Sequence, residues 1–210
     1  MIIAIDGPAA AGKGTLTRKL AKYYNLALLD TGLIYRAVGL KAVLNGDPSD
    51  SEIAIQAAKS IDLADLKIHD IRGELAAKSA SLVAAIPAVR DVLLEFQREF
   101  AHNPPDGKLG SILDGRDIGT VVCPDAKFKL YITASLEVRT DRRYKELQER
   151  GEEAIRSAVL DDIKTRDERD IARALSPLKP AGDAKIIDSS DFNASEVFSL
   201  AQEFISSQMK

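Results

Sequence analysis

The residues with the clearest chemical potential are two glycines and a lysine close to the beginning of the chain. Gly7, Gly12 and Lys13 follow a short apolar run and precede a helix-forming stretch. Glycines let the backbone turn sharply and bring its N–H groups close to an anion, and the lysine adds positive charge. The spacing is that of the phosphate-binding loop G-x-x-x-x-G-K-[ST], except that Gly14 takes the place of the hydroxyl residue and Thr15 follows it. We therefore predict a nucleotide-phosphate site over residues 7–15.

The elements on either side are those that a phosphate loop needs. Residues 2–5 are an apolar run suited to a buried parallel strand, and residues 15–22 have the amphipathic pattern of a helix. The loop would then end at a helix N-terminus, where backbone N–H groups and the helix dipole favour phosphate. The alternative is an ordinary glycine- and alanine-rich turn with Lys13 on the surface, which leaves the spacing of the glycines and the lysine to coincidence.

A second strand and helix carry two more polar residues. Residues 26–30 form an apolar run that ends in an aspartate, and residues 33–44 are predicted to be helical, so Thr31 and Arg36 lie near the start of that helix. In a parallel sheet, ligands bind beyond the carboxyl ends of the strands. We therefore expect Thr31 and Arg36 to face the same crevice as the glycine loop.

A third apolar run, residues 111–114, closes on Asp114. A carboxylate at the end of a strand beside a phosphate loop can hold Mg²⁺, or its waters, next to the β- and γ-phosphates. The alternative is a loop in which Asp114 caps a turn. We predict that Asp114 is a partner of the phosphate loop.

Charged residues recur at intervals of three and four between residues 151 and 180. This spacing puts them on one face of a helix, and they are Asp162, Arg166, Arg169, Asp170 and Arg173. A solvated face with i,i+4 ion pairs, each worth only about 0.2 to 0.5 kcal/mol, would explain part of the pattern. Arg169 and Arg173, however, are like charges four residues apart, which favours a bound anion or the neighbouring carboxylates as their partners. We therefore predict a helix that faces an anion.

The remaining pattern completes an α/β chain. Short helices are predicted between residues 49 and 86, and Pro87 begins a helix with one apolar stripe. Strands are predicted at 127–133 and 184–188, each followed by a helix, at 135–150 and 194–207. Strands that alternate with helices imply a parallel sheet covered on both faces. The expected fold is a three-layer α/β sandwich with a central parallel sheet.

Composition limits the class of protein. The chain has 210 residues, with 29 Lys and Arg against 32 Asp and Glu, for a net charge of -3. A non-specific nucleic-acid binder is usually basic, so any anion site must be a local cluster and no nucleic-acid partner is expected. The single cysteine, Cys123, makes no internal disulfide and fits a reducing compartment. Because we find neither a signal peptide nor an apolar run of roughly 18 residues, we expect one cytoplasmic domain without a membrane span.

Four motifs in this order carry a resemblance to a known family. They are the segments 7–15, 30–36, 114–120 and 166–170. Together they resemble the bacterial cytidylate kinases, a family of P-loop nucleoside monophosphate kinases, over nearly the whole chain. The resemblance implies an enzyme of the P-loop NTPase fold that transfers the γ-phosphoryl group of ATP to CMP or dCMP, with Mg²⁺. It also implies a monomer that binds these small nucleotides.

The resemblance further implies a core, a helical monophosphate-binding region and a short lid. The core would comprise residues 1–45, 108–150 and 181–210. The monophosphate-binding region would span about residues 46–107, and the lid about residues 151–180.

Roles for single residues follow from the resemblance as well. The triphosphate would be bound by Gly7, Pro8, Ala9, Ala10, Ala11, Gly12, Lys13, Gly14 and Thr15, with Lys13 neutralising charge on the transferred group. Mg²⁺ would be held by Thr15 and, partly through water, by Asp114. The CMP phosphate would be bound by Thr31, Arg36, Arg116 and Arg173, cytosine by Ser81, Arg90 and Asp117, and the ribose by Arg166 and Asp170. The lid arginines that meet the triphosphate would be Arg142, Arg143 and Arg169.

The chain departs from the family pattern in two places. Many bacterial members carry a small β insert in the monophosphate-binding region, whereas residues 45–74 are too few and too rich in alanine for it. This departure affects ribose discrimination and the motion of that region. The glycine loop also reads Ala9, Ala10 and Ala11 where serine or glycine is common, a change that should leave the backbone cradle intact.

Three other functions stay open at this point. The first is a kinase for another acceptor, such as UMP, AMP or a small-molecule alcohol. The second is a nucleotide-dependent switch, but such GTPases need an Asn-Lys-x-Asp segment, and the sequence has none. The third is a silent structural domain, for which Lys13→Ala would change neither ATP binding nor turnover.

Overall fold

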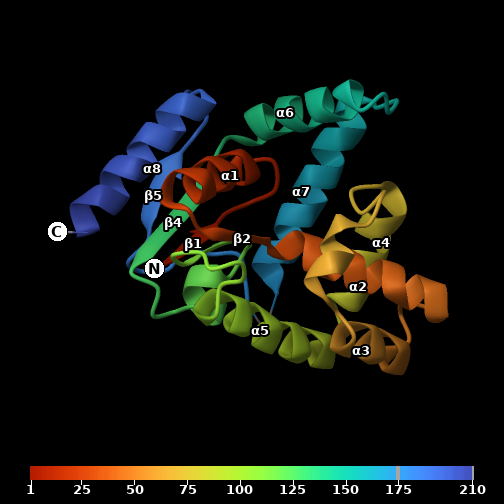
Figure 1. The fold of residues 1–210 in the computed structure, drawn as a ribbon. Coiled ribbons are helices and arrows are strands. Elements are labelled where there is room, and N and C mark those ends of the chain that lie inside the picture. The colour runs from red at the N-terminus through yellow and green to blue at the C-terminus, as the bar shows by residue number, and fades with distance from the viewer. Residues whose placement is uncertain (174–175, 210) are drawn as a thin grey trace. The chain divides into compact units, whose positions relative to one another are not determined.

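The computed structural model describes residues 1–173 and 176–209, and its elements follow one another in the predicted order (Figure 1). The strands are β1 (Ile2–Asp6), β2 (Ala27–Asp30), β3 (Ser111–Asp114), β4 (Phe128–Thr133) and β5 (Lys185–Asp188). The helices are α1 (Lys13–Tyr24), α2 (Thr31–Asn45), α3 (Ser51–Lys59), α4 (Glu74–Val83), α5 (Pro87–His102), α6 (Leu136–Glu149), α7 (Arg156–Ala172) and α8 (Ala194–Met209). Two short turns complete the set, the 3-10 helix η1 (Leu63–Lys67) and the π-helix η2 (Ile118–Val122).

The strands of the described residues form one five-stranded sheet in the order β2-β3-β1-β4-β5. β1 pairs in parallel with β3 and with β4, and β4 pairs in parallel with β5. In this register Ile5 of β1 lies opposite Asp114 of β3. Because parallel strands end at the same edge of a sheet, Asp6 and Asp114 both lie at the edge where the glycine loop begins. The predicted α/β fold with a central parallel sheet is confirmed.

The chain divides into two compact units, and each is described by itself. The first consists of Met1–Leu28 and Pro104–Lys210, and the second of Leu29–Asn103. The first unit contains the glycine loop, most of the sheet and the helices α6 to α8. The second contains the helices α2 to α5.

The core of the first unit lies between the strands and the helices α1 and α8. Its buried side chains are aliphatic, as expected for a sheet covered by helices, and each contributes about 1.5 to 3 kcal/mol when it leaves water. They include Ile3, Ile5, Ile112, Leu130 and Ile132 of the strands, Leu16 and Leu20 of α1, and Val197, Ala201 and Ile205 of α8. This packing fixes the end of β1, where the glycine loop starts.

Helices α6 and α7 of the first unit form a helical hairpin (Figure 1). Ser135 caps α6, because its hydroxyl accepts the N–H of Val138 at 3.3 Å. Across the hairpin, Nε of Arg156 at the start of α7 donates to Oδ1 of Asp141 of α6 at 2.6 Å. The hairpin carries all three arginines that the sequence predicts for the lid.

The second unit is a packed group of helices. α2 and α4 approach closely because Gly39 has no side chain: a Cβ there would lie 2.5 Å from Oγ of Ser79. Lys41 of α2 donates from Nζ to Oδ2 of Asp65 in η1 at 2.6 Å. Residues 46–73 hold α3 and η1, and none of the described strands lies there.

The predicted strands and helices agree with the structure to within about two residues, with one exception. The spacing predicts that the charged face of residues 162–173 lies on one helix, but α7 ends at Ala172 and Arg173 has extended backbone angles, φ -59° and ψ 130°. The N–H of Leu178 donates to the carbonyl oxygen of Asp170 at 2.8 Å, which brings Leu178 close to the last turn of α7. Residues 174 and 175 of the predicted lid lie outside the described residues.

A membrane span would need a long and strongly apolar helix. Over the described residues no helix has both properties.

Candidate active site

The glycine loop passes from β1 to α1 through three left-handed backbone positions. Gly7 has φ 144°, Ala10 φ 59° and Gly12 φ 90°. A Cβ at Gly7 would lie 1.9 Å from the carbonyl oxygen of Ile132 in β4, so only glycine fits there. Gly12 is the N-cap of α1 without a side-chain cap, and the first turn of α1 has no acidic residue. The loop therefore ends at a helix N-terminus suited to an anion.

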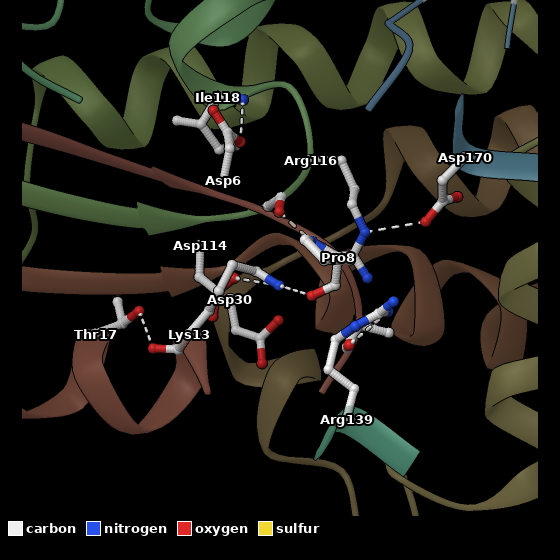
Figure 2. Close-up of polar contacts among 12 residues, drawn as sticks. Asp6, Pro8, Lys13, Thr17, Asp30, Asp114, Arg116, Ile118, Arg139 and Asp170 are labelled. Atoms are coloured by element: carbon white, nitrogen blue, oxygen red, sulfur yellow. Dashed lines mark hydrogen bonds and ion pairs between the residues drawn. The ribbon is translucent and has the colours of Figure 1, made fainter. Parts of the chain in front are cut away.

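Lys13 is folded back over the loop. Its side chain is almost fully buried, and its Nζ donates to the carbonyl oxygen of Pro8 at 2.9 Å (Figure 2). The same ammonium lies 3.8 Å from Oδ1 of Asp114. The hydroxyl of Thr17 donates to the carbonyl oxygen of Lys13 at 2.7 Å and holds the first turn of α1. The ammonium thus lies between the loop and the carboxylate, as a lysine that binds a phosphate there would.

The predicted metal ligands, Thr15 and Asp114, belong to the first turn of α1 and to the end of β3. Asp114 is 8 % exposed at the end of β3, and a Cβ at Gly14 would lie 3.7 Å from its Oδ2. Thr15 is exposed in the first turn of α1, and its hydroxyl accepts a hydrogen bond from Arg18 at 3.4 Å. Mg²⁺ usually takes one or two protein oxygen ligands together with substrate phosphates and water. A hydroxyl and a carboxylate beside a phosphate loop fit that donor set.

Arg142 is the predicted lid arginine that the structure brings to the glycine loop. It donates from Nη1 to Oγ of Ser189 at 2.8 Å and from Nη2 to the carbonyl oxygen of Ser189 at 2.6 Å. Ser189 in turn donates from Oγ to the carbonyl oxygen of Ala11 at 3.0 Å. A Cβ at Gly12 would lie 3.8 Å from Nη1 of Arg142. Burial lowers the pKa of the Arg142 guanidinium, and Asp188 opposes this shift.

The other two lid candidates do not reach the loop in this way. Arg143 pairs with Glu146 of its own helix at 2.9 Å, and Arg169 is exposed in the last turn of α7.

A second guanidinium, that of Arg139, touches the loop instead. Arg139 is 6 % exposed and donates to the carbonyl oxygens of Ala134 at 3.0 Å and Ala9 at 3.4 Å. Its Nη2 pairs with Oδ2 of Asp167 in α7 at 2.6 Å. The other carboxylate oxygen of Asp167 is buried, with no hydrogen-bond partner among the described residues. Arg139 therefore links helix α7 to the loop.

Three predicted acceptor-site arginines meet on one buried carboxylate, that of Asp170, which is 2 % exposed. Nε of Arg116 donates to Oδ2 at 3.0 Å (Figure 2), and Nη2 of Arg173 pairs with Oδ1 at 2.6 Å. Arg166 lies one helical turn before, with Nε 4.0 Å from Oδ2. We call Arg116, Arg166 and Arg173 around Asp170 the arginine cluster. Guanidinium groups gathered in this way form a positively charged cluster, which suits an anion such as a phosphate monoester.

Asp6 is a buried carboxylate beside the loop. Its Oδ1 accepts the N–H of Ile118, and its Oδ2 accepts the N–H of Gly119, both at 2.7 Å. Burial raises the pKa of the Asp6 carboxyl to about 6, and the two N–H donors oppose the shift. Asp117 lies directly before these amides, and its charge raises the pKa further, whereas Lys13 lowers it.

The second unit holds the other predicted acceptor residues. Thr31 is buried in the first turn of α2, and Nη1 of Arg36 donates to the carbonyl oxygens of Ile71 at 3.2 Å and Gly73 at 3.5 Å. The guanidinium of Arg90 lies over the ring of Tyr35, 5.8 Å from its centroid. Ser81 is exposed on α4, and its hydroxyl donates to the carbonyl oxygen of Ala77 at 3.1 Å.

Sequence reasoning missed three residues of this site. Asp6 ends an apolar run, and the signal for it is a charge directly before a phosphate loop. Arg139 is one of several basic residues in a predicted helix, and nothing in its spacing distinguishes it. Ser189 follows the last strand, where a ligand or loop contact is common in a parallel sheet.

A comparison with protein families gives one match over almost the whole chain. The model of the cytidylate kinase family matches residues 3–207.

Named relatives agree with this match. A cytidylate kinase of Paramagnetospirillum magneticum is 56 % identical over 208 residues, which cover 99 % of this chain and 98 % of that one. A cytidylate kinase of Rhodospirillum rubrum is 48 % identical over 206 residues, which cover 98 % of this chain and 97 % of that one.

Solved structures share the fold. An uncharacterized protein from Eubacterium ventriosum has a TM-score of 0.58 at 15 % identity, covering 99 % of each chain. A protein from Thermus thermophilus has a TM-score of 0.51 at 17 % identity, covering 100 % of this chain and 98 % of that one.

Proposed function

The chain belongs to the cytidylate kinase family, and we propose that it transfers the γ-phosphoryl group of ATP to CMP or dCMP, giving ADP and CDP or dCDP. The observation that carries the proposal is the arginine cluster on Asp170, in the same unit as a glycine loop of the phosphate-binding type. The loop suits the triphosphate of ATP, and the guanidinium groups of the cluster suit the phosphate of the acceptor.

The glycine loop would bind the triphosphate of ATP. Backbone N–H groups at the start of α1 would donate to the phosphate oxygens. Lys13 would donate to these oxygens as well, in place of its hydrogen bond to the carbonyl oxygen of Pro8. Arg142 and Arg139 contact the loop from α6 and would add positive charge to the same group. Arg143 and Arg169 would meet the triphosphate only if the lid moves.

The residues that would bind the acceptor are those named from the family resemblance. The CMP phosphate would be bound by Thr31, Arg36, Arg116 and Arg173, cytosine by Ser81, Arg90 and Asp117, and the ribose by Arg166 and Asp170. Asp170 accepts hydrogen bonds from the arginines around it. A carboxylate can also accept hydrogen bonds from the hydroxyl groups of a ribose.

The reaction needs no nucleophilic side chain. An oxygen of the CMP phosphate attacks the γ-phosphorus of ATP, and the bond from that phosphorus to the bridging oxygen of ADP breaks. Both substrates are anions, so Lys13 and the arginines must bring them together in line and stabilise the charge on the transferred group. Arginine suits this work because its planar guanidinium binds phosphate in a bidentate way. A Mg²⁺ ion held by Thr15 and Asp114 would neutralise phosphate charge and orient the triphosphate.

The division into regions follows from the same proposal. We expect the core over residues 1–45, 108–150 and 181–210, the monophosphate-binding region over about residues 46–107, and the lid over about residues 151–180. A lid would exclude water, which otherwise accepts the phosphoryl group. We also propose a monomer that acts on small nucleotides in the cytoplasm and has no nucleic-acid partner.

A panel of acceptors tests the proposal. The purified chain is incubated with ATP, Mg²⁺ and, in turn, CMP, dCMP, UMP, AMP and GMP, and ADP formation is measured. We expect turnover of CMP or dCMP well above that of the purine nucleotides, because a site built to hydrogen-bond one base rejects others by large factors. Equal turnover of AMP and CMP would contradict the assignment of the acceptor.

A further inference from the structure

Asp6 is a buried charge that the proposed chemistry does not use. It ends β1 directly before the glycine loop and is 3 % exposed. Figure 2 shows its carboxylate at the N–H of Ile118, and its second oxygen accepts the N–H of Gly119. These amides lie 112 and 113 residues further along the chain. The carboxylate therefore joins the strand before the glycine loop to the segment that follows β3.

The two amides are the first of η2, the π-helical turn Ile118–Val122. N–H groups at the start of a helical turn have no partner within it, and Asp6 supplies that partner from outside. Gly119 permits the approach, since a Cβ there would lie 3.3 Å from Oδ2 of Asp6 and 3.2 Å from Cδ of Lys129. The position of this backbone is thus set by the carboxylate on one side and by Lys129 on the other.

Only a carboxylate satisfies both donors. Asparagine would offer one carbonyl oxygen, and its NH₂ group would face an N–H. Burying a carboxylate is unfavourable unless hydrogen bonds compensate for its lost hydration. The carboxylate of Asp6 fixes the position of the Ile118 and Gly119 amides through these two hydrogen bonds.

The residues directly before these amides are predicted acceptor residues. Arg116 lies two positions before Ile118, and its Nε donates to the buried carboxylate of Asp170. Asp117 lies between them, and its carbonyl oxygen accepts the N–H of Val121 in η2 at 2.8 Å. A shift of the anchored amides would therefore move the backbone from which both side chains extend.

We propose that Asp6 is a positioning residue for the acceptor: by holding the amides of Ile118 and Gly119, it fixes the backbone that presents Arg116 and Asp117. The inference rests on the proposed function and deepens it. The proposal predicts an unusual pattern. Asp6 is next to the ATP loop in the sequence, and yet its substitution should affect the binding of CMP. A residue that merely supports the fold would affect both substrates or neither.

Steady-state kinetics of Asp6→Asn, with ATP and CMP varied separately, test the proposal. The substitution keeps the size of the side chain and removes the charge and one acceptor. We expect the KM for CMP to rise about tenfold or more, because a hydrogen bond to a charged group is lost, and the KM for ATP to change by less than about twofold. Equal changes in the two values, or no change in either, would overturn the proposal.

A second variant approaches the same anchor from the other side and keeps the test valid if Asp6→Asn does not fold. In Gly119→Ala the new methyl group pushes the amide away from Asp6 and Lys129 without altering any charge. The same selective rise in the KM for CMP is expected. Gly182→Ala is the matched control, because a Cβ at Gly182 meets nothing within 4 Å. A rise in the KM for CMP in both alanine variants, or in neither, would count against the proposal.

Two further measurements separate positioning from loss of stability and from failure of the function itself. Val197→Ala weakens the core at α8 and should leave both KM values unchanged. In an Arg116→Ala background, Asp6→Asn should cause a smaller loss than it causes in the wild-type chain, because part of its effect passes through Arg116, and fully additive losses would overturn the inference. A wild-type chain that turns over no acceptor would overturn the proposed function together with this inference, whereas CMP turnover that Asp6→Asn affects without selectivity overturns the inference alone.

Discussion

The glycine loop and the arginine cluster are both suited to phosphate, but they are built in different ways. The loop is one continuous segment, and the groups that we propose for phosphate binding are backbone amides at a helix N-terminus together with Lys13. The cluster collects side chains from positions 116, 166 and 173 on one buried carboxylate. The loop therefore depends on backbone conformation, and the cluster depends on the balance of charge around Asp170.

Because of this difference, the two sites are sensitive to different kinds of substitution. Side chains of the loop that only fill space can be exchanged if the backbone keeps its left-handed positions. In the cluster each guanidinium counts, because removing one alters the charge that remains for a ligand. The two kinds of site should therefore respond differently to substitution.

Lys13→Ala tests the one side chain on which the loop depends. We expect the kcat to fall by about 10³-fold or more, because a preorganised charge is lost from phosphoryl transfer. Turnover of CMP with saturating ATP measures the effect. Lys22→Ala, at an exposed position in the last turn of α1, is the control and should keep full activity. A loss of less than tenfold in Lys13→Ala would show that the loop works through its amides alone.

Arg173→Ala tests the cluster. We expect kcat/KM for CMP to fall about 10²-fold, because a guanidinium paired with a buried carboxylate is lost, while the KM for ATP stays within about threefold. Varying each substrate in turn separates the two effects. Lys164→Ala, an exposed position on α7, serves as the control. If the affinity for ATP fell instead, Arg173 would belong to the ATP site, and the contrast between the loop and the cluster would be wrong.

Asp6 joins the loop to the segment that carries Arg116, and its ionisation gives a pH test of that connection. Burial raises its pKa from 3.8 to about 6 in the folded chain. The folded state therefore binds this proton more tightly, so the stabilisation is complete below about pH 3.8 and is lost as the pH rises through about 6.

The expected size is about 3 kcal/mol at most, from the difference between the two pKa values. Asp6→Asn cannot ionise, so its free energy of unfolding relative to wild type should increase by most of this amount between pH 4 and pH 7. Urea unfolding of both proteins at several pH values measures it. A constant difference between the two curves would contradict the buried ionisation. Lys13, Asp117 and Tyr131 are the charged or titratable neighbours that interact with Asp6, and they are unchanged in both proteins.

Ser189→Ala tests a support of the loop by a side chain. The hydroxyl that joins Arg142 to the carbonyl oxygen of Ala11 is lost, at a cost of about 1 kcal/mol. We expect the KM for ATP to rise roughly fivefold and the KM for CMP to stay constant. Ser199→Ala, on the exposed face of α8, should change neither value. A larger effect on CMP would place Ser189 on the acceptor side.

Ala10→Gly tests the smallest effect, that of a loop side chain which only fills space. Ala10 has φ 59°, where an L-residue is strained by about 1 kcal/mol and glycine is not. Relief of strain and the greater freedom of the unfolded chain nearly offset each other, so the free energy of unfolding should change by less than about 1 kcal/mol. Gly12→Ala, at φ 90°, should be clearly destabilising. Equal effects of the two substitutions, measured by urea unfolding, would show that backbone conformation does not control the loop.

Features that depend on neighbouring residues in the sequence could be predicted, whereas features that depend on residues far apart were harder to predict. The glycine loop was predictable because a strand, two glycines, a lysine and a helix follow one another directly. The strands and helices were predictable for the same reason, since their patterns repeat within a few residues.

The arginine cluster was harder, because its geometry depends on which segments meet. Helical spacing indicated Arg166 and Asp170 but put Arg173 on the helix, whereas the chain leaves the helix before it. The role of Arg116 was predicted only from the family resemblance, and its hydrogen bond to Asp170 joins residues 54 positions apart. Asp6 was missed because its role depends on amides more than a hundred residues away, which no local pattern contains.

The bond from Lys13 to the carbonyl oxygen of Pro8 bears on how the nucleotide leaves. When the product departs, the ammonium need not return to bulk solvent, because an oxygen of the main chain is available 2.9 Å away. Departure then exchanges one partner for another instead of exposing a buried cation. Since product release limits the turnover of many enzymes, an internal substitute of this kind would favour repeated cycles over tight retention.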